Sequence, residues 1–239
     1  MARDSSVATL ARLDWRMKLD GQDAVVVGLG EAVFDRFVEH DRTILGGAPL
    51  NMAFHAHQIL SLFGGHGTVL SRVGRDGLGD QVVSELQSAG LPTGNIQRDA
   101  NHATGDVVVT VDECNENHYS ITPNVAWDHI EFDDSAAELA AICSAVCFGT
   151  LAQRSAQSRA AIHEFLAATD ALIICDVNLR QDFYSAETLR SSLTVAGVVK
   201  LNEEELKVVS RELNLAADTE NDLASVLLNA FNLELIALT

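Results

Sequence analysis

The sequence predicts an α/β fold in which an open, largely parallel sheet is covered by helices and interrupted by a small β excursion. Short apolar runs rich in valine alternate with segments whose apolar residues recur at helical spacing, as in parallel sheets built from strand–helix units. Residues 104–122 alternate instead with a period of two around an Asn/Glu turn, which indicates a hairpin. With 239 residues, 47% of them hydrophobic, the chain can bury one large core.

The first half of the chain supplies two strands and two helices. Residues 23–35, DAVVVGLGEAVFD, are predicted to form a buried strand, and residues 66–74 a second one. Residues 49–63 carry apolar positions at helical spacing. A helix within residues 76–90 is indicated by Asp76, whose side chain suits the capping of a helix start, and by a glycine at the end of the stretch.

The alternation of helices and strands resumes after the hairpin. The predicted strands lie near residues 145–149, 171–176, 197–201 and 233–238, with helices between them. We expect residues 1–22 to form an N-terminal tail and residues 23–239 to form the main domain. A β lid is expected from about residues 36–45 and 93–122. A lid beside the carboxyl ends of parallel strands is well placed to cover a ligand bound there.

Composition narrows the class of partners. The chain carries 34 Asp and Glu against 16 Lys and Arg, so its formal net charge is −18. Such a charge repels nucleic acid and anionic lipid, and we expect neither nucleic acid nor a membrane as a partner. An anionic ligand would need a locally basic pocket, although an acidic surface that only keeps the protein in solution is the simpler explanation of the charge.

The cysteines and the N-terminus point to a cytoplasmic protein. No C-x-x-C pair occurs among Cys114, Cys143, Cys147 and Cys175, which favours reduced thiols and no metal site. The first twenty residues lack the long apolar centre of a signal peptide, and no apolar run approaches the ~20 residues of a membrane span.

The sequence does not contain either of two common nucleotide-binding motifs. In GLGEAV, Val33 stands where a dinucleotide fingerprint has its third glycine, and the sequence continues into FDRF instead of a long helix. This argues against a Rossmann oxidoreductase. The P-loop pattern is absent. If the protein binds a nucleotide, it therefore does so through a different phosphate-binding structure.

The stretch GGAPLN combines two glycines, a proline and an amide. Gly46 and Gly47 lack a Cβ atom, so the backbone can approach a small polar ligand, and Pro49 fits the start of a helix. Asn51 then lies in the first helical turn, where its amide can act toward a sugar hydroxyl as donor and acceptor together. A glycine turn with a self-capping asparagine explains the same residues equally well.

Two charged residues suit a polar ligand at the same strand ends. The carboxylate of Asp35 can accept two hydroxyl hydrogen bonds, although an aspartate in a turn after a strand is the simpler explanation. Arg180, in DVNLR, carries a planar guanidinium that suits phosphate oxygens, and a surface ion pair is its alternative role.

Six motifs stand together in one order and spacing: GLGEAVFD, GGAPLN, VGRDGLG, FGTLAQR, DVNLRQDFYS and VVKLNEEE. In these motifs the chain resembles the ribokinase-like (PfkB-type) carbohydrate kinases, and GLGEAVFD and FGTLAQR are similar to the fructokinase branch. The resemblance runs from about residue 23 to residue 239. It implies a ribokinase-like fold with a β lid and an ATP-dependent kinase that transfers the γ-phosphate to a hydroxyl of fructose or a similar sugar.

The resemblance also implies the residues of the site. Those expected to hold the sugar are Asp35, Gly46, Gly47, Asn51, Asn178 and Arg180. Those expected near the phosphates and Mg²⁺ are Lys200, Asn202 and Glu205. The Mg²⁺ would be held through its water molecules with no direct protein ligand, whereas Glu203 and Glu204 are assigned to the helix N-terminus instead. Tyr119 of the lid either contacts the sugar or packs, and a homodimer through the lid is left open.

One expected segment is missing from these 239 residues. The family's late G-A-G-D segment supplies the catalytic base and an anion hole, and the nearest match is ATGD at residues 103–106. No helix follows that match, so Asp106 is not expected to be the base. We therefore expect the N-terminal part of a kinase, inactive alone, with its base beyond Thr239. A non-catalytic paralogue or fragment that keeps a sugar pocket is the alternative.

Overall fold

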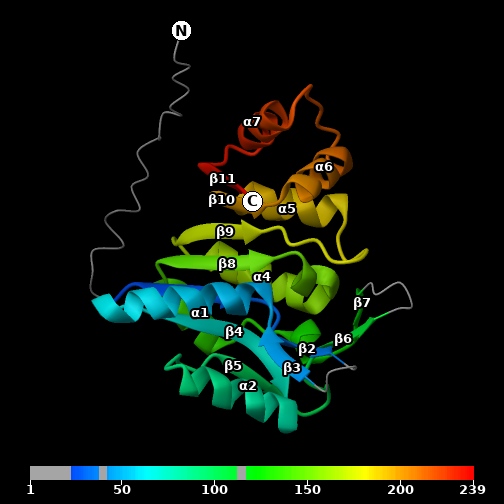
Figure 1. Cartoon of the computed structure of the whole chain (residues 1–239). Coiled ribbons are helices and arrows are strands. Elements are labelled where there is room, and N and C mark those ends of the chain that lie inside the picture. Colours follow the sequence, from blue (N-terminus) through cyan, green and yellow to red (C-terminus); the bar gives the residue numbers. More distant parts are fainter. Residues whose placement is uncertain (1–22, 38–41, 112–116) are drawn as a thin grey trace.

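The computed structural model describes residues 23–37, 42–111 and 117–239. The expected tail at residues 1–22 lies outside these ranges, as do Cys114 and short parts of the expected lid. Within them the chain forms a large sheet with helices against it and a smaller sheet beside one end of its strands (Figure 1).

The large sheet is parallel throughout, as expected. Its seven strands lie in the order β11-β10-β9-β8-β1-β4-β5, and every neighbouring pair is parallel. The strands are β1 (Val25–Leu29), β4 (His66–Gly74), β5 (Ile96–Asp99), β8 (Ala145–Gly149), β9 (Leu172–Asp176), β10 (Val198–Leu201) and β11 (Leu235–Leu238). From β1 the chain builds the sheet first toward β5 and then, from β8, in the opposite direction. Ligands of open α/β sheets bind at the carboxyl ends of the strands beside such a reversal.

Seven helices of the described chain accompany the sheet. They are α1 (Ala48–Leu60), α2 (Gly77–Ser88), α3 (Asp134–Ile142), α4 (Ala156–Ala168), α5 (Ala186–Val195), α6 (Glu203–Glu212) and α7 (Glu220–Ala230). Helices α1 and α2 share an apolar cluster with Val69 and Val73 of β4. The neighbouring Leu70 belongs to a second cluster, which includes buried residues of α3 to α7. Because side chains alternate along a strand, α1 and α2 pack against one face of β4, and Leu70 on its other face belongs to the cluster of the remaining helices.

The smaller sheet is the expected lid. Its strands β2 (Val33–Phe37), β3 (Arg42–Gly46), β6 (Asp106–Val111) and β7 (Asn117–Ile121) lie in the order β3-β2-β6-β7. The pairs β2–β3 and β6–β7 are antiparallel, and a parallel pairing of β2 with β6 joins them. The hairpin predicted within residues 104–122 is therefore β6 and β7.

Two expectations about these sheets are wrong. Residues 23–35 do not form one strand, because β1 ends at Leu29 and β2 starts the lid sheet at Val33, with Gly30 at φ +144° between them. Residues 93–122 were also expected to belong to the lid as a whole, but β5 at the start of this range pairs with β4 in the large sheet. The reason is burial: Ile96 packs in the cluster of α1 and α2.

Local contacts explain two helix positions. Asp76 caps α2 as predicted, because its Oδ1 accepts a hydrogen bond from the Gly79 amide at 2.8 Å. Gly28 of β1 lies against α1 so closely that a Cβ atom there would collide with the carbonyl oxygen of Pro49. The start of α1 is therefore fixed beside the end of β1.

Three of the four cysteines lie within the described ranges. Cys143, Cys147 and Cys175 are buried, and burial raises the pKa of the Cys147 thiol to about 12. None of the helices in the described ranges combines the length and apolar character needed to cross a membrane.

Candidate active site

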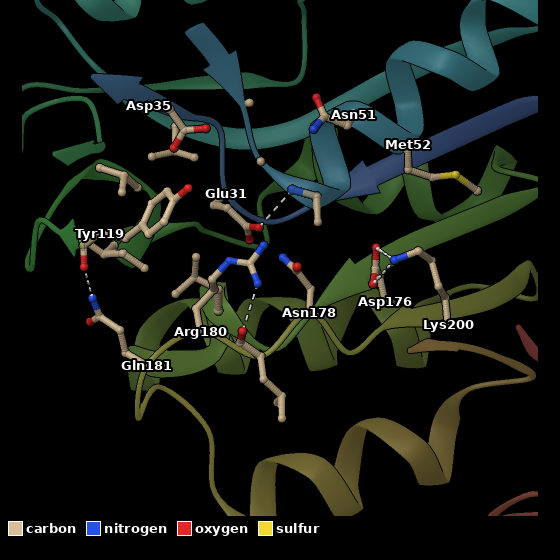
Figure 2. Close-up of a pocket in the computed structure, with 18 of the residues that line it drawn as sticks. Glu31, Asp35, Asn51, Met52, Tyr119, Asp176, Asn178, Arg180, Gln181 and Lys200 are labelled. Atoms are coloured by element: carbon tan, nitrogen blue, oxygen red, sulfur yellow. Dashed lines mark hydrogen bonds and ion pairs between the residues drawn. The ribbon is translucent and has the colours of Figure 1, made fainter. Parts of the chain in front are cut away.

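A cavity of about 970 Å³ opens at the carboxyl ends of β1, β9 and β10, below the lid sheet and beside the start of α1 (Figure 2). Seven of the nine predicted site residues line it: Asp35, Gly46, Gly47, Asn51, Asn178, Arg180 and Lys200. Asn202 and Glu205 are not among its lining residues. The cavity lies where the strand order reverses, which is the usual ligand position in such sheets.

The glycine turn leads directly into α1. Gly47 precedes the first helical residue, Ala48, and accepts a hydrogen bond from the Asn51 amide at 2.9 Å. The N-cap residue Gly47 has no side chain to cap the helix, and the side-chain amide of Asn51 makes no hydrogen bond within the described chain, so it is not used for self-capping. Figure 2 shows this amide on the α1 side of the cavity. Asn51 is therefore available to a ligand.

Gly46 and Gly47 are in different structural environments. Gly47 adopts φ +113°, and a Cβ atom there would collide with the carbonyl oxygen of Glu31, so this glycine admits the protein's own backbone. Gly47 also lines the cavity, so its role in the approach of a ligand stays a prediction beside this structural need. A Cβ atom on Gly46 would lie 3.5 Å from Oδ2 of Asp35, within ordinary contact distance.

Asp35 is presented by the lid sheet. Strand β2 places it opposite Ile44 of β3 and beside Val107 of β6. Burial raises the pKa of Asp35, and the positive charge of Arg180 partly opposes that rise. In the described part of the chain its carboxylate makes no hydrogen bond, which leaves it free to accept hydroxyl groups.

The loop after β9 supplies Asn178 and Arg180 from across the cavity. Asn178 has a left-handed backbone with φ +38°, which an asparagine tolerates better than most residues. Arg180 donates to the carbonyl oxygen of Leu179 at 3.0 Å, and its guanidinium points into the cavity toward Glu31. Gln181 links this loop to the lid, because its Nε2 donates to the carbonyl oxygen of Tyr119 at 2.6 Å.

Lys200 already has an anionic partner. Its Nζ lies 3.0 and 3.2 Å from the two carboxylate oxygens of Asp176. Burial raises the pKa of Asp176, and the hydrogen bond from Lys200 lowers it in part. A phosphate contact by Lys200 would have to share the ammonium group with this carboxylate.

Asn202 and Glu205 form a capping box at the start of α6. The Asn202 side chain accepts from the Glu205 amide at 2.8 Å, and Oε2 of Glu205 accepts from the Asn202 amide at 2.9 Å. Oε1 of Glu205 accepts from the amide of Leu179 at 2.9 Å, so this carboxylate also holds the loop after β9. A role at the helix N-terminus was expected for Glu203 and Glu204 only, and the structure shows that Asn202 and Glu205 also have one.

Asp106 belongs to the lid and not to the cavity. It lies in β6, where its carboxylate bonds to Arg36 at 2.8 Å and accepts from the Thr122 hydroxyl at 2.5 Å. Strand residues of β6 follow it directly, as expected. These contacts argue against a role for Asp106 as a base.

Sequence reasoning missed two carboxyl groups of the cavity, Glu31 and Asp176. Glu31 is 1% exposed, and burial raises its pKa to about 7. A signal was present in GLGEAV, where an ionisable residue directly follows a strand that is otherwise apolar. Asp176 ends β9 in the same way, at the start of the DVNLR motif.

The cavity therefore mixes charges of both signs. The three carboxyl groups come from Glu31, Asp35 and Asp176, and the two cations from Arg180 and Lys200. Many donors and acceptors in one cavity suit a polyhydroxy ligand, and the two cations are the locally basic group that an anionic ligand needs in an acidic protein.

The fold and this cavity define a class of α/β protein with a polar cavity beneath a β lid at the carboxyl edge of a parallel sheet. Comparison with known families agrees, because the model of the pfkB family carbohydrate kinases matches residues 24–237. The chain belongs to this family.

Individual relatives are more distant. A fructokinase of Salmonella typhimurium is 28% identical over 207 residues, which cover 81% of this chain and 65% of the relative. The chain thus spans less than two thirds of that protein's length.

Two solved structures share the fold. The fructokinase of Xylella fastidiosa with bound ATP has a TM-score of 0.72 at 21% identity, covering 90% of this chain and 68% of the other. The fructokinase double mutant of Vibrio cholerae O395, in its fructose, ADP and potassium ion bound form, has a TM-score of 0.74 at 21% identity, covering 92% and 71%.

Proposed function

We propose that this chain carries the sugar-binding part of an ATP-dependent, fructokinase-like sugar kinase. The observation that carries the proposal is the convergence of Asp35, Asn51 and Arg180 on one cavity from three separate elements: the lid, the start of α1 and the loop after β9. The named activity of the Salmonella relative and the fructose in the Vibrio structure support fructose or a similar sugar as the ligand.

In the proposed site the sugar lies between the lid and the loop after β9. Asp35 accepts hydrogen bonds from its hydroxyls, and the Asn51 amide both donates and accepts. Asn178 and Arg180 contact it from the opposite side, with the guanidinium near the phosphate that is transferred. Gly46 leaves room beside Asp35. The lid excludes water, which would otherwise compete with the sugar hydroxyl.

We propose ATP and Mg²⁺ as the cofactors, placed at the β10 side of the cavity. Both carboxylate oxygens of Glu205 accept backbone hydrogen bonds, so direct metal ligation there would compete with the capping box. Each carboxylate oxygen has a second lone pair, however, and Mg²⁺ keeps much of its water shell. Asn202, Glu205 and Lys200 therefore suit contacts to the water molecules of the ion and to the nucleotide phosphates.

Phosphoryl transfer needs a group that accepts the proton of the sugar hydroxyl, and no such group is assigned in these 239 residues. The hydroxyl oxygen bonds to the γ-phosphorus, the bond to ADP breaks, and the released proton needs a base. The engagement of Asp106 within the lid supports the view that the base is absent. The alternative function is sugar binding without catalysis, and turnover distinguishes the two.

Sugar binding is tested by calorimetry with fructose. Asp35→Ala and Asn51→Ala should each weaken binding by roughly 5- to 150-fold, because each leaves a sugar hydroxyl without its partner, at about 1–3 kcal/mol. Asp134→Ala, at an exposed site in the first turn of α3, is the control and should bind as the wild type. If all three variants bound fructose with equal affinity, the result would contradict the proposed site.

Turnover is tested with the 239-residue chain and with a fusion to the C-terminal part of the Salmonella relative. A base and an anion hole each contribute about 10²–10⁴-fold, so the chain alone should show no ATP-dependent fructose phosphorylation above background. The fusion should be active, and Arg180→Ala should reduce its rate. An ordinary kinase rate from the chain alone that Asp106→Asn abolishes would contradict this expectation.

Further expectations about the protein remain predictions. These are a cytoplasmic location, a tail at residues 1–22, and a homodimer formed through the lid.

A further inference from the structure

Glu31 is the buried carboxyl group at the floor of the cavity. It follows β1 directly and lies between the start of α1 and Arg180 (Figure 2). Its Oε1 accepts a hydrogen bond from the Ala48 amide at 3.3 Å. Its Oε2 is buried and has no hydrogen-bond partner among the described residues. Most buried polar atoms are paired, so an unpaired carboxyl oxygen that faces a ligand cavity requires a specific explanation.

The fold does not need an ionisable group at this position. The hydrogen bond that Oε1 of Glu31 accepts from the first helical amide of α1 needs only an acceptor oxygen, which a glutamine would also provide. A carboxyl group is costlier to bury than an amide because burial disfavours its charged form. The carboxyl group therefore points to a role outside the fold.

Charged and titratable groups from several elements line the same cavity as Glu31. They are Asp35 from β2, His55 from α1, Tyr119 from β7, Asp176 and Arg180 from the end of β9 and its loop, and Lys200 from β10. Burial raises the pKa of Glu31 to about 7; Arg180 lowers it, and Asp176 raises it further. Near neutral pH the empty site therefore contains both the protonated and the ionised form.

We propose that Glu31 is a further ligand-binding residue, whose Oε2 accepts a hydrogen bond from one sugar hydroxyl and thereby couples sugar binding to the release of a proton. The inference rests on the proposed sugar-binding function. A hydroxyl donates a stronger hydrogen bond to a carboxylate than to a neutral carboxylic acid. The sugar thus selects the ionised form of Glu31, and the proton that leaves the carboxyl group passes to the solvent.

Proton linkage is measured by titrating fructose into the wild-type chain at pH 7 in phosphate and in Tris, whose ionisation enthalpies differ. The wild type should release a fraction of a proton per sugar bound, and its affinity should rise between pH 6 and pH 8. Glu31→Gln keeps an acceptor for the Ala48 amide but cannot titrate. This variant should release markedly less, show a flatter pH dependence and bind fructose about fivefold more weakly at pH 8.

Two comparisons make the result specific. Glu138→Gln, at an exposed position of α3, is the matched control and should behave as the wild type. Among monodeoxy fructoses, the one that lacks the contacting hydroxyl should lose affinity for the wild type but much less for Glu31→Gln. A loss of affinity that depends on Glu31 in this way identifies the hydroxyl that donates a hydrogen bond to Oε2.

The outcomes separate this inference from the function on which it rests. Binding without proton release, proton uptake, or a release that Glu31→Gln leaves unchanged would overturn the role of Glu31 while the sugar site stands. A bound water that fills the space beside Oε2 would give this result. If the wild type binds no fructose at all, the proposed function fails, and the inference fails with it.

Discussion

The two sides of the cavity treat their polar groups in opposite ways. On the side formed by the lid, the end of β1 and the start of α1 (the lid side), Asp35 and Asn51 make no side-chain hydrogen bond within the described chain, and Glu31 leaves its Oε2 without a partner there. On the β10 side, Lys200 is paired with a carboxylate, and Glu205 accepts a backbone hydrogen bond on each of its oxygens.

This difference separates groups that stabilise the protein from groups that are available to a ligand. A paired polar group loses a hydrogen bond when its partner is removed, so its substitution lowers the free energy of unfolding. An unpaired group contributes no such bond, and burial penalises it. Substitutions on the β10 side should therefore affect stability first, and those on the lid side should affect binding first.

The largest stability effect is expected at Glu205. Glu205→Ala removes the acceptor of two backbone amides, those of Leu179 and Asn202, at a position that is 8% exposed. At about 1–3 kcal/mol for each unsatisfied group, the free energy of unfolding should fall by about 4 kcal/mol. Urea unfolding of the variant measures this.

The control for Glu205 is its neighbour Glu204. The Glu204 side chain is 83% exposed, and its ion pair with Lys207 contributes little. Glu204→Ala should stay within about 0.5 kcal/mol of the wild type. A loss as large as that of Glu205→Ala would mean that the capping box is not what stabilises this side.

The next effect is a pH dependence caused by Glu31. Its pKa rises from 4.5 to about 7 on folding, so between these values the folded protein holds a proton that the unfolded chain has released. The free energy of unfolding should therefore fall as the pH rises from about 4.5 to about 7 and stay level above it. At ~1.4 kcal/mol per pKa unit, Glu31 accounts for about 3 kcal/mol of this fall.

Glu31→Gln isolates that contribution. Asp35 and Asp176 also have raised pKa values and add slopes of the same sign, which the variant retains. The difference in the free energy of unfolding between the wild type and Glu31→Gln should therefore change by about 3 kcal/mol from pH 4.5 to pH 8. Parallel curves would show that Glu31 is ionised as easily in the folded as in the unfolded chain.

The smallest stability effect is expected at Asp35. Asp35→Asn keeps the shape of the side chain and removes a charge that burial disfavours, so the free energy of unfolding at pH 7 should stay within about 0.5 kcal/mol or increase. Fructose affinity should fall in the same variant. A clear loss of stability would place Asp35 with the paired groups and end the contrast between the two sides.

Much of the fold follows from local patterns. Strand β8 was predicted with the bounds that the structure shows, and Asp76 caps α2 as expected. A run of buried residues and a capping side chain both act within a few residues of the chain, so the sequence carries these signals directly. The break after Leu29 and the pairing of β5 depend on distant partners, and no local pattern contains them.

The amino-acid sequence alone determined the parallel sheet, the lid hairpin, the order of the motifs and the identity of seven residues that line the cavity. The tertiary structure alone decided which of these groups are already in use. Gly47 makes room for the backbone of Glu31, Glu205 holds the amide of Leu179, and Oε2 of Glu31 remains unpaired. Hydrogen bonding and desolvation depend on atoms that lie far apart in the chain, so they exist only once the strands and loops have been brought together.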